Sequence, residues 1–244
     1  MAPQLSVIVP AFNEAARIGP TLDRLVAFAE ALSGGVEVLV VDDGSTDGTA
    51  SFAQRPEYRD SPMLRWLCLP RNRGKGAALR AGVLASAGAE VLLCDADLST
   101  PIEEYERLRP HLESAGLVLG SRGVADSKIT RRQPAYRELM GRLFNVVVRV
   151  VAVGGIRDTQ CGFKLLRGDL ARTLFADMKI DRFAFDVELV WLARRRGATV
   201  KEVGVVWHDS PASSVHALRD SARMLADILR IRWLHRGEPA GRIR

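Results

Sequence analysis

Short apolar runs alternate with amphipathic segments throughout the first half of the chain. The apolar runs, which predict buried strands, cover residues 5–9, 36–41, 64–69, 90–94 and 117–120. Between them, apolar residues recur at spacings of three and four, and this periodicity predicts helices at 15–32, 75–87 and 101–114. Because alternating strands and helices form βαβ units, we expect an α/β fold with a mainly parallel central sheet flanked by helices.

The second half of the chain has a less regular pattern. Residues 122–134 are polar and basic and are expected to form a loop, whereas residues 200–207 have the composition of a strand. Helical periodicity returns at 136–153, 183–196 and 213–235. Because no internal repeat, low-complexity tract or linker interrupts the sequence, the whole chain is expected to form a single domain.

Charge separates the two halves more clearly. Residues 1–120 contain 11 Lys and Arg against 16 Asp and Glu, a net charge of −5, and residues 121–244 contain 24 against 13, a net charge of +11. An acidic half and a basic half indicate two different tasks within one fold. Hydrophobic residues make up 47% of the chain and charged residues 26%, which argues against a disordered chain, a coiled coil or collagen.

Cysteines and apolar stretches restrict the cellular setting. Cys68, Cys94 and Cys161 form no CxxC pair, which indicates neither a disulfide framework nor a zinc site and favours a reducing compartment. Cys68 and Cys94 lie in apolar runs and are expected in the core. The longest apolar stretch, residues 143–156, is interrupted by an arginine and falls short of the ~20 residues of a membrane span. No basic region precedes residues 5–12, so no signal peptide is predicted.

Residues suited to nucleotide binding follow the first two strands, at the edge where parallel sheets bind ligands. Pro10 is expected to end the first strand, while Phe12 offers an aromatic face and Glu14 a carboxylate that together could hold a nucleobase. After the second strand, Asp42 and Asp43 could bind a ribose hydroxyl or a base edge. Both stretches could instead be turns with helix-capping side chains.

The next two strands are followed by residues suited to phosphate binding. Gly74 and Gly76 let the backbone approach a ligand closely, and Lys75 adds positive charge at a predicted helix N-terminus, where anions are favoured. Asp95 and Asp97 could share Mg²⁺ or Mn²⁺, which would bridge a diphosphate; a solvated turn is the alternative. No GxxxxGK phosphate loop is present and no GxGxxG motif follows the first strand, so neither a P-loop enzyme nor a dinucleotide reductase is predicted.

Three of these strand ends carry motifs that, in this order, resemble the inverting GT-A glycosyltransferases of family 2. The motifs are PAFNE at residues 10–14, VDDGS at 41–45 and DAD at 95–97. One of them alone would carry little weight, but together they occupy successive strand ends. The resemblance implies a GT-A fold and the transfer of a sugar from a nucleotide sugar.

Motifs elsewhere narrow the resemblance to the dolichyl-phosphate β-glucosyltransferase branch. They are NRGKG at residues 72–76, GSR at 120–122, GIRDTQCGFKL at 155–165 and FAFDVEL at 183–189. Bacterial polyprenyl-phosphate sugar synthases, including an N-acetylgalactosaminyl synthase, are similar too. The resemblance extends over roughly residues 4–235. It implies that a hexose or an N-acetylhexosamine passes from a UDP-sugar to a polyprenyl phosphate, which attacks the anomeric carbon opposite the departing metal–diphosphate.

The resemblance also assigns roles along the chain. Residues 1–120 would form the nucleotide-sugar-binding half, residues 121–212 the acceptor half, and residues 213–236 an amphipathic C-terminal helix. The donor is expected to contact Pro10, Phe12, Glu14, Asp42, Asp43, Lys75 and Asp95. The metal, Mg²⁺ or Mn²⁺, would be bound by Asp95 and Asp97, and the acceptor phosphate by Arg122, Arg131, Arg132, Arg137 and Gln160. The catalytic residues would be Asp97, Arg122 and Asp158.

The chemistry of a phosphate acceptor agrees with the basic character of the second half of the chain. A phosphate is already anionic at pH 7, so it needs cationic positioning more than a strong general base, and arginine supplies this positioning bidentately. Asp158 would then orient the acceptor site rather than abstract a proton. The sequence departs from the family in one donor residue, because Phe12 stands where the family often has Tyr.

The sequence lacks the transmembrane helices that many family members carry. We therefore expect a cytoplasmic protein, peripheral on the cytoplasmic face of the membrane, or one held there by a separate small membrane protein. Within 213–235 an apolar stripe is flanked by arginines, as in a helix that lies in a membrane interface; a helix packed on the core shows the same stripe. The stripe consists of Leu218, Ala222, Leu225, Leu229 and Trp233.

Other functions fit the sequence less well. A family 2 enzyme that extends a polysaccharide usually shows Q-x-x-R-W, and here Arg232 and Trp233 are present but position 229 is Leu. A non-catalytic basic module that binds nucleic acid or a membrane surface is disfavoured by the acidic strand ends and by the absence of a basic–aromatic stripe. We therefore expect no nucleic-acid partner. A sugar nucleotidyltransferase would require a glycine-rich phosphate loop after the first strand.

Overall fold

A seven-stranded sheet with helices on both faces forms the body of the protein. The computed structural model describes residues 2–131, 148, 153–208 and 217–237. The sheet has the strand order β3-β2-β1-β4-β7-β5-β8, and only β7 runs antiparallel to its neighbours. The strands are β1 (Leu5–Ala11), β2 (Val36–Asp42), β3 (Leu64–Cys68), β4 (Glu90–Leu93), β5 (Leu117–Ser121), β7 (Lys164–Arg167) and β8 (Val200–Gly204). This architecture confirms the predicted α/β fold.

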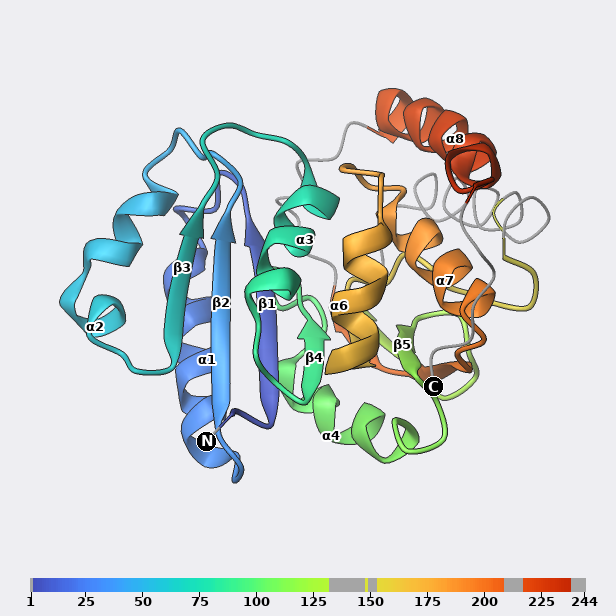
Figure 1. Cartoon of the computed structure of the whole chain (residues 1–244). Coiled ribbons are helices and arrows are strands. Elements are labelled where there is room, and N and C mark those ends of the chain that lie inside the picture. The colour runs from blue at the N-terminus through green and yellow to red at the C-terminus, as the bar shows by residue number, and fades with distance from the viewer. Residues whose placement is uncertain (1, 132–147, 149–152, 209–216, 238–244) are drawn as a thin grey trace.

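Each face of the sheet has its own hydrophobic core, because alternate strand residues point to opposite sides. Ile8 and Leu39 belong to the core under α3 (Lys75–Ala85), α6 (Gly168–Asp177) and α7 (Phe185–Arg195). Val7 and Val38 belong to the core under α1 (Ile18–Ala31), α2 (Pro56–Arg59) and α4 (Tyr105–Leu108). In Figure 1, α3 and α6 lie in front of the sheet and α1 behind it. Of the cysteines, Cys94 and Cys161 are buried, whereas Cys68 is exposed, contrary to expectation.

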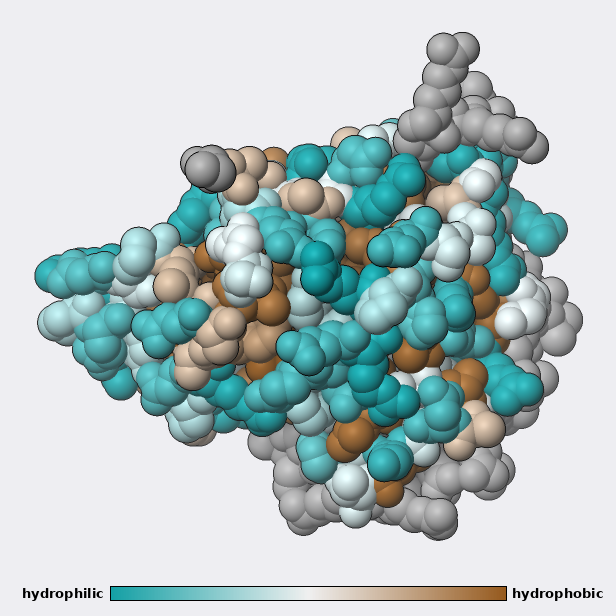
Figure 2. Space-filling model, turned by 90° about the horizontal axis from the view of Figure 1, so that it is seen from below, coloured by the Kyte–Doolittle hydropathy of each residue, from teal (hydrophilic) through white to brown (hydrophobic). Residues whose placement is uncertain are grey.

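The register of the parallel strands brings their carboxyl ends to one edge. Ala11 pairs with Asp42 across β1 and β2, and Ile8 pairs with Leu93 across β1 and β4. The strand β1 continues through Pro10, contrary to expectation, because pairing with β4 has already ended at Ile8 and the missing N–H of proline costs no ladder bond there. Figure 2 shows the opposite end of the molecule, where hydrophilic residues predominate.

Short elements in the second half differ from the predicted ones. The predicted loop 122–134 contains β6 (Lys128–Arg131), which pairs with β9 (Val206–His208) in a separate two-stranded sheet. The predicted strand 200–207 is divided at Val205, because its N–H donates to the Ser121 carbonyl of β5 while its carbonyl accepts from Lys128 of β6. The pattern did not predict β7 or α6.

Some of the predicted helices are confirmed, whereas others are broken or lie outside the described residues. The expected helix 101–114 is broken into the 3-10 turns Ile102–Glu104 and Arg109–His111 around the short α4, and Pro110 disrupts the helical pattern there. The expected helix 183–196 is confirmed as α7, and 213–235 corresponds to α8 (Ala217–Leu234), with residues 213–216 outside the described part. Apart from Val148 and Val153, residues 136–153 also lie outside it.

Candidate active site

Two loops at the carboxyl ends of β1 and β2 are tied together by side chains. The Asn13 N–H donates to Ser45 Oγ (2.9 Å), and Asn13 Oδ1 accepts from the Thr46 N–H (2.9 Å). Asn13 therefore does not cap α1, which begins only at Ile18; it joins the two loops. Phe12, in the first loop, keeps an exposed fraction of 37%, so its ring presents a face to solvent.

Asp42 and Asp43, the acidic pair after β2, are both buried. Asp43 Oδ1 accepts from the Arg73 N–H (2.9 Å), and Oδ2 accepts from the Gly74 N–H (2.7 Å) and from the Asn72 side chain (2.9 Å). Burial raises the pKa of Asp43, and these N–H groups only partly offset the effect. The Asp43 carboxylate thus fixes the loop of residues 71–76, and its contact with a donor remains a prediction.

The 71–76 loop borders a cleft of about 540 Å³ beyond the end of β3. Its lining residues are Leu69, Pro70, Arg71, Asn72, Arg73 and Asp181. Gly74 has a φ of +114°, and a Cβ there would lie 2.6 Å from the Asp181 carbonyl oxygen, so only glycine fits this close approach. Glycine at this position therefore lets the loop pack directly against residues 180–182.

Asp95 and Asp97 follow β4 and face the same edge of the sheet. Asp95 forms an ion pair with Lys75, the first residue of α3. Burial alone lowers the pKa of Lys75, but the charges of Asp95 and Asp186 outweigh burial and raise it; conversely, burial raises the pKa of Asp95, but Lys75 outweighs it and lowers the value. Both groups are therefore charged at neutral pH. Asp97 Oδ1 accepts from the Ser99 N–H (3.0 Å), and Oδ2 lies 3.7 Å from Arg17 Nη1.

The chemistry of these two carboxylates suits a hard divalent cation, and a metal bound by them remains a prediction. Among the described residues, no group of three or more His, Cys, Asp or Glu side chains could hold a metal by itself. Mg²⁺ is typically bound by one or two carboxylates, with substrate phosphates and water completing its coordination, and Asp95 and Asp97 supply such a pair. A Cβ at Gly162 would collide with the Asp95 carboxylate, so this glycine leaves the carboxylate the room it occupies.

Two charged residues whose charges act on Asp95 lie within the quoted motifs but were not among the predicted site residues. Lys164 of β7 is fully buried, forms an ion pair with Asp186 of α7 and donates to the Cys161 carbonyl (2.5 Å). Burial raises the pKa of Asp186, and Lys164 only partly counteracts this. The signal that could have identified the pair was a carboxylate within the apolar FAFD stretch, which requires a buried cation as its partner.

Arg122, after β5, is held by Asp158 in a bidentate ion pair. The distances are 2.7 Å from Nε to Oδ2 and 2.9 Å from Nη2 to Oδ1, and the Arg122 N–H also donates to Oδ2 (3.0 Å). Burial raises the pKa of Asp158, but Arg122 outweighs burial and lowers it to about 2. The Arg122 side chain remains 28% exposed and its guanidinium lies 5.3 Å from the Trp207 ring.

Glu202 of β8 supports the Arg122–Asp158 pair through hydrogen bonds, and the sequence analysis did not predict this role. Its carboxylate accepts from the N–H groups of Arg157 and Asp158 (both 2.8 Å) and from Ser121 Oγ (2.9 Å). Asp158 is therefore fixed through its backbone while its side chain holds Arg122. The positive charge of Arg122 also lowers the pKa of Asp95, although less than Lys75 does, so the charges of the two groups interact.

The other predicted acceptor residues are described unequally. The Gln160 N–H donates to Asp158 Oδ1 (3.2 Å), and its side chain contacts Met224 Sδ of α8 (3.9 Å). Arg131 ends β6, but the structure does not describe its side chain, and Arg132 and Arg137 lie outside the described residues. The structure thus brings Arg122, Asp158 and Gln160 together and leaves the remaining acceptor arginines as predictions.

Comparison with known proteins identifies the class. The family model for glycosyl transferase family 2 matches residues 6–175. The chain belongs to this family and is a glycosyltransferase. Solved glycosyltransferases of the GT-A type share its fold: a glucosyl-3-phosphoglycerate synthase from Mycobacterium tuberculosis, crystallised with UDP, is 22% identical with a TM-score of 0.68, over 94% of this chain and 80% of that one. A mannosyltransferase from Pyrobaculum calidifontis, in complex with GDP-mannose and Mn²⁺, is 22% identical with a TM-score of 0.61, over 97% and 71%.

Curated relatives carry a narrower name. The dolichyl-phosphate β-glucosyltransferase of Drosophila melanogaster is 37% identical, over 95% of this chain and 74% of that protein. The proteins of the same name from Dictyostelium discoideum and Homo sapiens are 36% and 34% identical, each over 94% of this chain and over 74% and 75% of their own lengths.

Across the described residues, no helix is both long enough and apolar enough to cross a membrane.

Proposed function

We propose that this glycosyltransferase moves glucose from UDP-glucose to a polyprenyl phosphate, with inversion at the anomeric carbon. One observation carries the proposal: Arg122 is held by Asp158 in a bidentate ion pair, and its charge interacts with that of the Asp95 carboxylate. An acidic site suits a metal-bound diphosphate, and the arginine suits the phosphate of an acceptor. The curated dolichyl-phosphate β-glucosyltransferases point to glucose and to a polyprenyl phosphate acceptor.

On the donor side, the exposed ring of Phe12 would stack on the base of the nucleotide. Asp95 and Asp97 would hold Mg²⁺ or Mn²⁺, which when bound neutralises negative charge on a diphosphate leaving group. Lys75, at the start of α3, forms an ion pair with Asp95 and could also donate a hydrogen bond to the diphosphate. Contacts of Pro10, Glu14 and Asp42 with the donor are part of this proposal.

On the acceptor side, Arg122 would orient the lipid phosphate. Because Asp158 has a pKa of about 2, it stays ionised at neutral pH and acts by positioning Arg122, not by moving a proton. The anionic phosphate oxygen would form a bond to the anomeric carbon as the bond to the UDP oxygen breaks on the opposite face. No strong general base is required for this displacement, since the nucleophile is already deprotonated.

We also propose that the enzyme works at the cytoplasmic face of a membrane, where a lipid phosphate and a cytoplasmic nucleotide sugar meet. Anchoring would be peripheral or through a separate small membrane protein.

The test is a donor panel. Purified protein, Mg²⁺ or Mn²⁺ and polyprenyl phosphate are incubated with radiolabelled UDP-glucose, UDP-N-acetylglucosamine, UDP-N-acetylgalactosamine or GDP-mannose, and labelled lipid is extracted. We expect transfer from UDP-glucose, with a β-linked product. Preferred transfer from an N-acetylhexosamine donor would replace glucose in the proposal, and label recovered only in polysaccharide would favour the polysaccharide-extending alternative.

A further inference from the structure

Helix α8 has an exposed apolar side in addition to the side that packs on the protein. Leu225, Leu229 and Trp233 have exposed fractions of 37%, 61% and 60%. They recur every four residues and therefore lie along one side of the helix. Half of the large hydrophobic side chains that are strongly exposed in the described part of the chain belong to this one helix.

The buried side of α8 already attaches the helix to the catalytic body. That side consists of Met224, Ile228, Ile231 and His235. His235 contacts the buried Glu188 of α7 (2.6 Å), and Lys179 Nζ donates to the Leu234 carbonyl (2.8 Å). Core packing thus explains one side of the helix and leaves the exposed apolar side without a role in folding.

Positive charge borders the exposed apolar side. Arg223, Arg230, Arg232 and Arg236 are all exposed, and the Arg236 guanidinium lies 4.9 Å from the Trp233 ring. Asp227, the one acidic residue whose side chain is described in this helix, pairs with Arg230 (3.0 Å). Arginines around leucine and tryptophan suit an anionic lipid surface, because guanidinium groups bind headgroup phosphates while the apolar side chains enter the acyl boundary.

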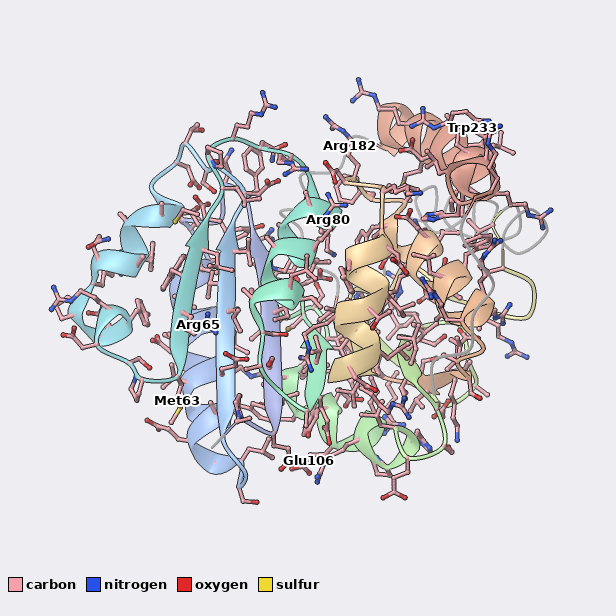
Figure 3. The ribbon with its side chains drawn as sticks, in the orientation of Figure 1. Met63, Arg65, Arg80, Glu106, Arg182 and Trp233 are labelled. Carbon is pink, nitrogen blue, oxygen red and sulfur yellow. The ribbon has the colours of Figure 1, made fainter. Side chains whose placement is uncertain are left out.

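The helix stands next to the predicted acceptor site. Met224 on its buried side contacts Gln160, which in turn bonds to Asp158. Figures 1 and 3 show α8 and Trp233 at the end of the molecule toward which the parallel strands point. A membrane in contact with α8 would therefore lie beside the residues proposed to receive the acceptor phosphate.

We propose that Leu225, Leu229 and Trp233, with the surrounding arginines, dock the protein on an anionic phospholipid bilayer. The biological purpose of docking, which is to bring a lipid phosphate to Arg122, rests on the proposed function. Binding itself requires neither donor nor acceptor. It can therefore be measured separately from glycosyl transfer.

The experiment is co-sedimentation of the full chain with vesicles of phosphatidylcholine alone or with added phosphatidylglycerol. We expect salt-sensitive binding to the anionic vesicles. Leu229→Ser/Trp233→Ser should weaken it at least about tenfold by removing buried apolar area. Arg223→Gln/Arg232→Gln should weaken it roughly fivefold for each arginine lost. Matched controls are Leu84→Ser on α3 and Arg59→Gln on α2, both exposed and away from α8, and these should bind like the wild type.

Folding is checked by circular dichroism and thermal unfolding, and the altered side chains are exposed, so the variants should fold. The proposal is overturned if the wild type stays in the supernatant with anionic vesicles, or if both α8 variants bind as tightly as it does. A second outcome would also overturn it: the wild type does not bind vesicles but forms a dimer, and Leu229→Ser/Trp233→Ser abolishes that dimer. Vesicle binding without any glycosyl transfer would leave the docking surface intact and would refute the proposed function instead.

Discussion

Both carboxylate oxygens of Asp158 accept hydrogen bonds from the Arg122 guanidinium, at 2.7 and 2.9 Å. The backbone N–H of Asp158 in turn donates to the Glu202 carboxylate. The guanidinium is therefore fixed on one side and open on the other, with 28% of the side chain exposed. A cation held in this way can receive an anionic ligand without first losing side-chain freedom.

Arg122 is expected to serve the acceptor and not the donor. Arg122→Lys, which keeps the charge but loses the bidentate geometry, should raise the KM for polyprenyl phosphate roughly tenfold or more. The Kd for UDP-glucose, measured by calorimetry, should change by less than about twofold. Arg157→Ala, which alters an exposed neighbouring side chain, is the matched control. Equal losses for both substrates would assign Arg122 to the donor diphosphate.

Asp97 is expected to act through the metal. Asp97→Asn should lower kcat by roughly 100-fold or more, since a loss of ~3 kcal/mol of charge stabilisation corresponds to that factor. Binding of Mn²⁺ in the presence of UDP, followed by calorimetry, should weaken in parallel. The exposed Asp169→Asn is the control. Undiminished wild-type activity in excess chelator would contradict a metal role for this carboxylate.

Gly162 is expected to be intolerant of any side chain. Gly162→Ala places a methyl group against the Asp95 carboxylate, which must move. We expect weaker Mn²⁺–UDP binding with a far-ultraviolet circular dichroism spectrum like that of the wild type. Gly237→Ala meets no atom within 4 Å and should bind normally. Normal Mn²⁺–UDP binding by Gly162→Ala would show that the position of Asp95 is not critical.

Acid should weaken the contribution of the Asp158–Arg122 pair to stability. The pKa of Asp158 is about 2 in the folded protein, below its usual value of about 3.9, so its stabilisation is fully present above pH ~4 and is lost as the pH falls toward 2. The shift corresponds to about 2 kcal/mol. In urea titrations, Asp158→Asn should be less stable than the wild type at pH 6, and the gap should narrow by pH 3. A gap independent of pH would refute the ion-pair explanation.

Lys164 and Asp186 are expected to depend on each other for burial. Lys164→Met leaves a buried carboxylate without its cation and should lower the free energy of unfolding by about 3–5 kcal/mol. Lys164→Met/Asp186→Leu removes both charges and should recover much of that loss. Lys201→Met, an exposed lysine on β8, is the control. If the double variant were as unstable as Lys164→Met, the coupling between the two charges would be disproved.

Local sequence pattern was sufficient to predict the parallel half of the sheet and to locate the residues at its carboxyl edge. Buried parallel strands are continuous apolar runs, so β1, β2, β3, β4 and β5 stand out, and the polar residues that end each run mark the ligand-binding edge. Asp95, Asp97 and Lys75 could be selected in this way because local pattern placed them. The Arg122–Asp158 stretch was selected by motif resemblance, since no periodicity marks it.

The pairing of the charges depends on contacts between segments that are distant in the sequence, so it became visible only in the folded protein. β7 escaped prediction because it is short and begins with a lysine, and Lys164 is buried only because Asp186, from α7, lies against it. Asp43 was predicted to bind the donor, and only the structure shows that its oxygens also accept hydrogen bonds from the distant 71–76 loop; its contact with the donor stays a prediction. The side of α8 that packs could not be read from its sequence, because both sides carry apolar residues. Burial against α7 leaves Leu229 and Trp233 exposed, since contacts between distant segments are not encoded in local periodicity.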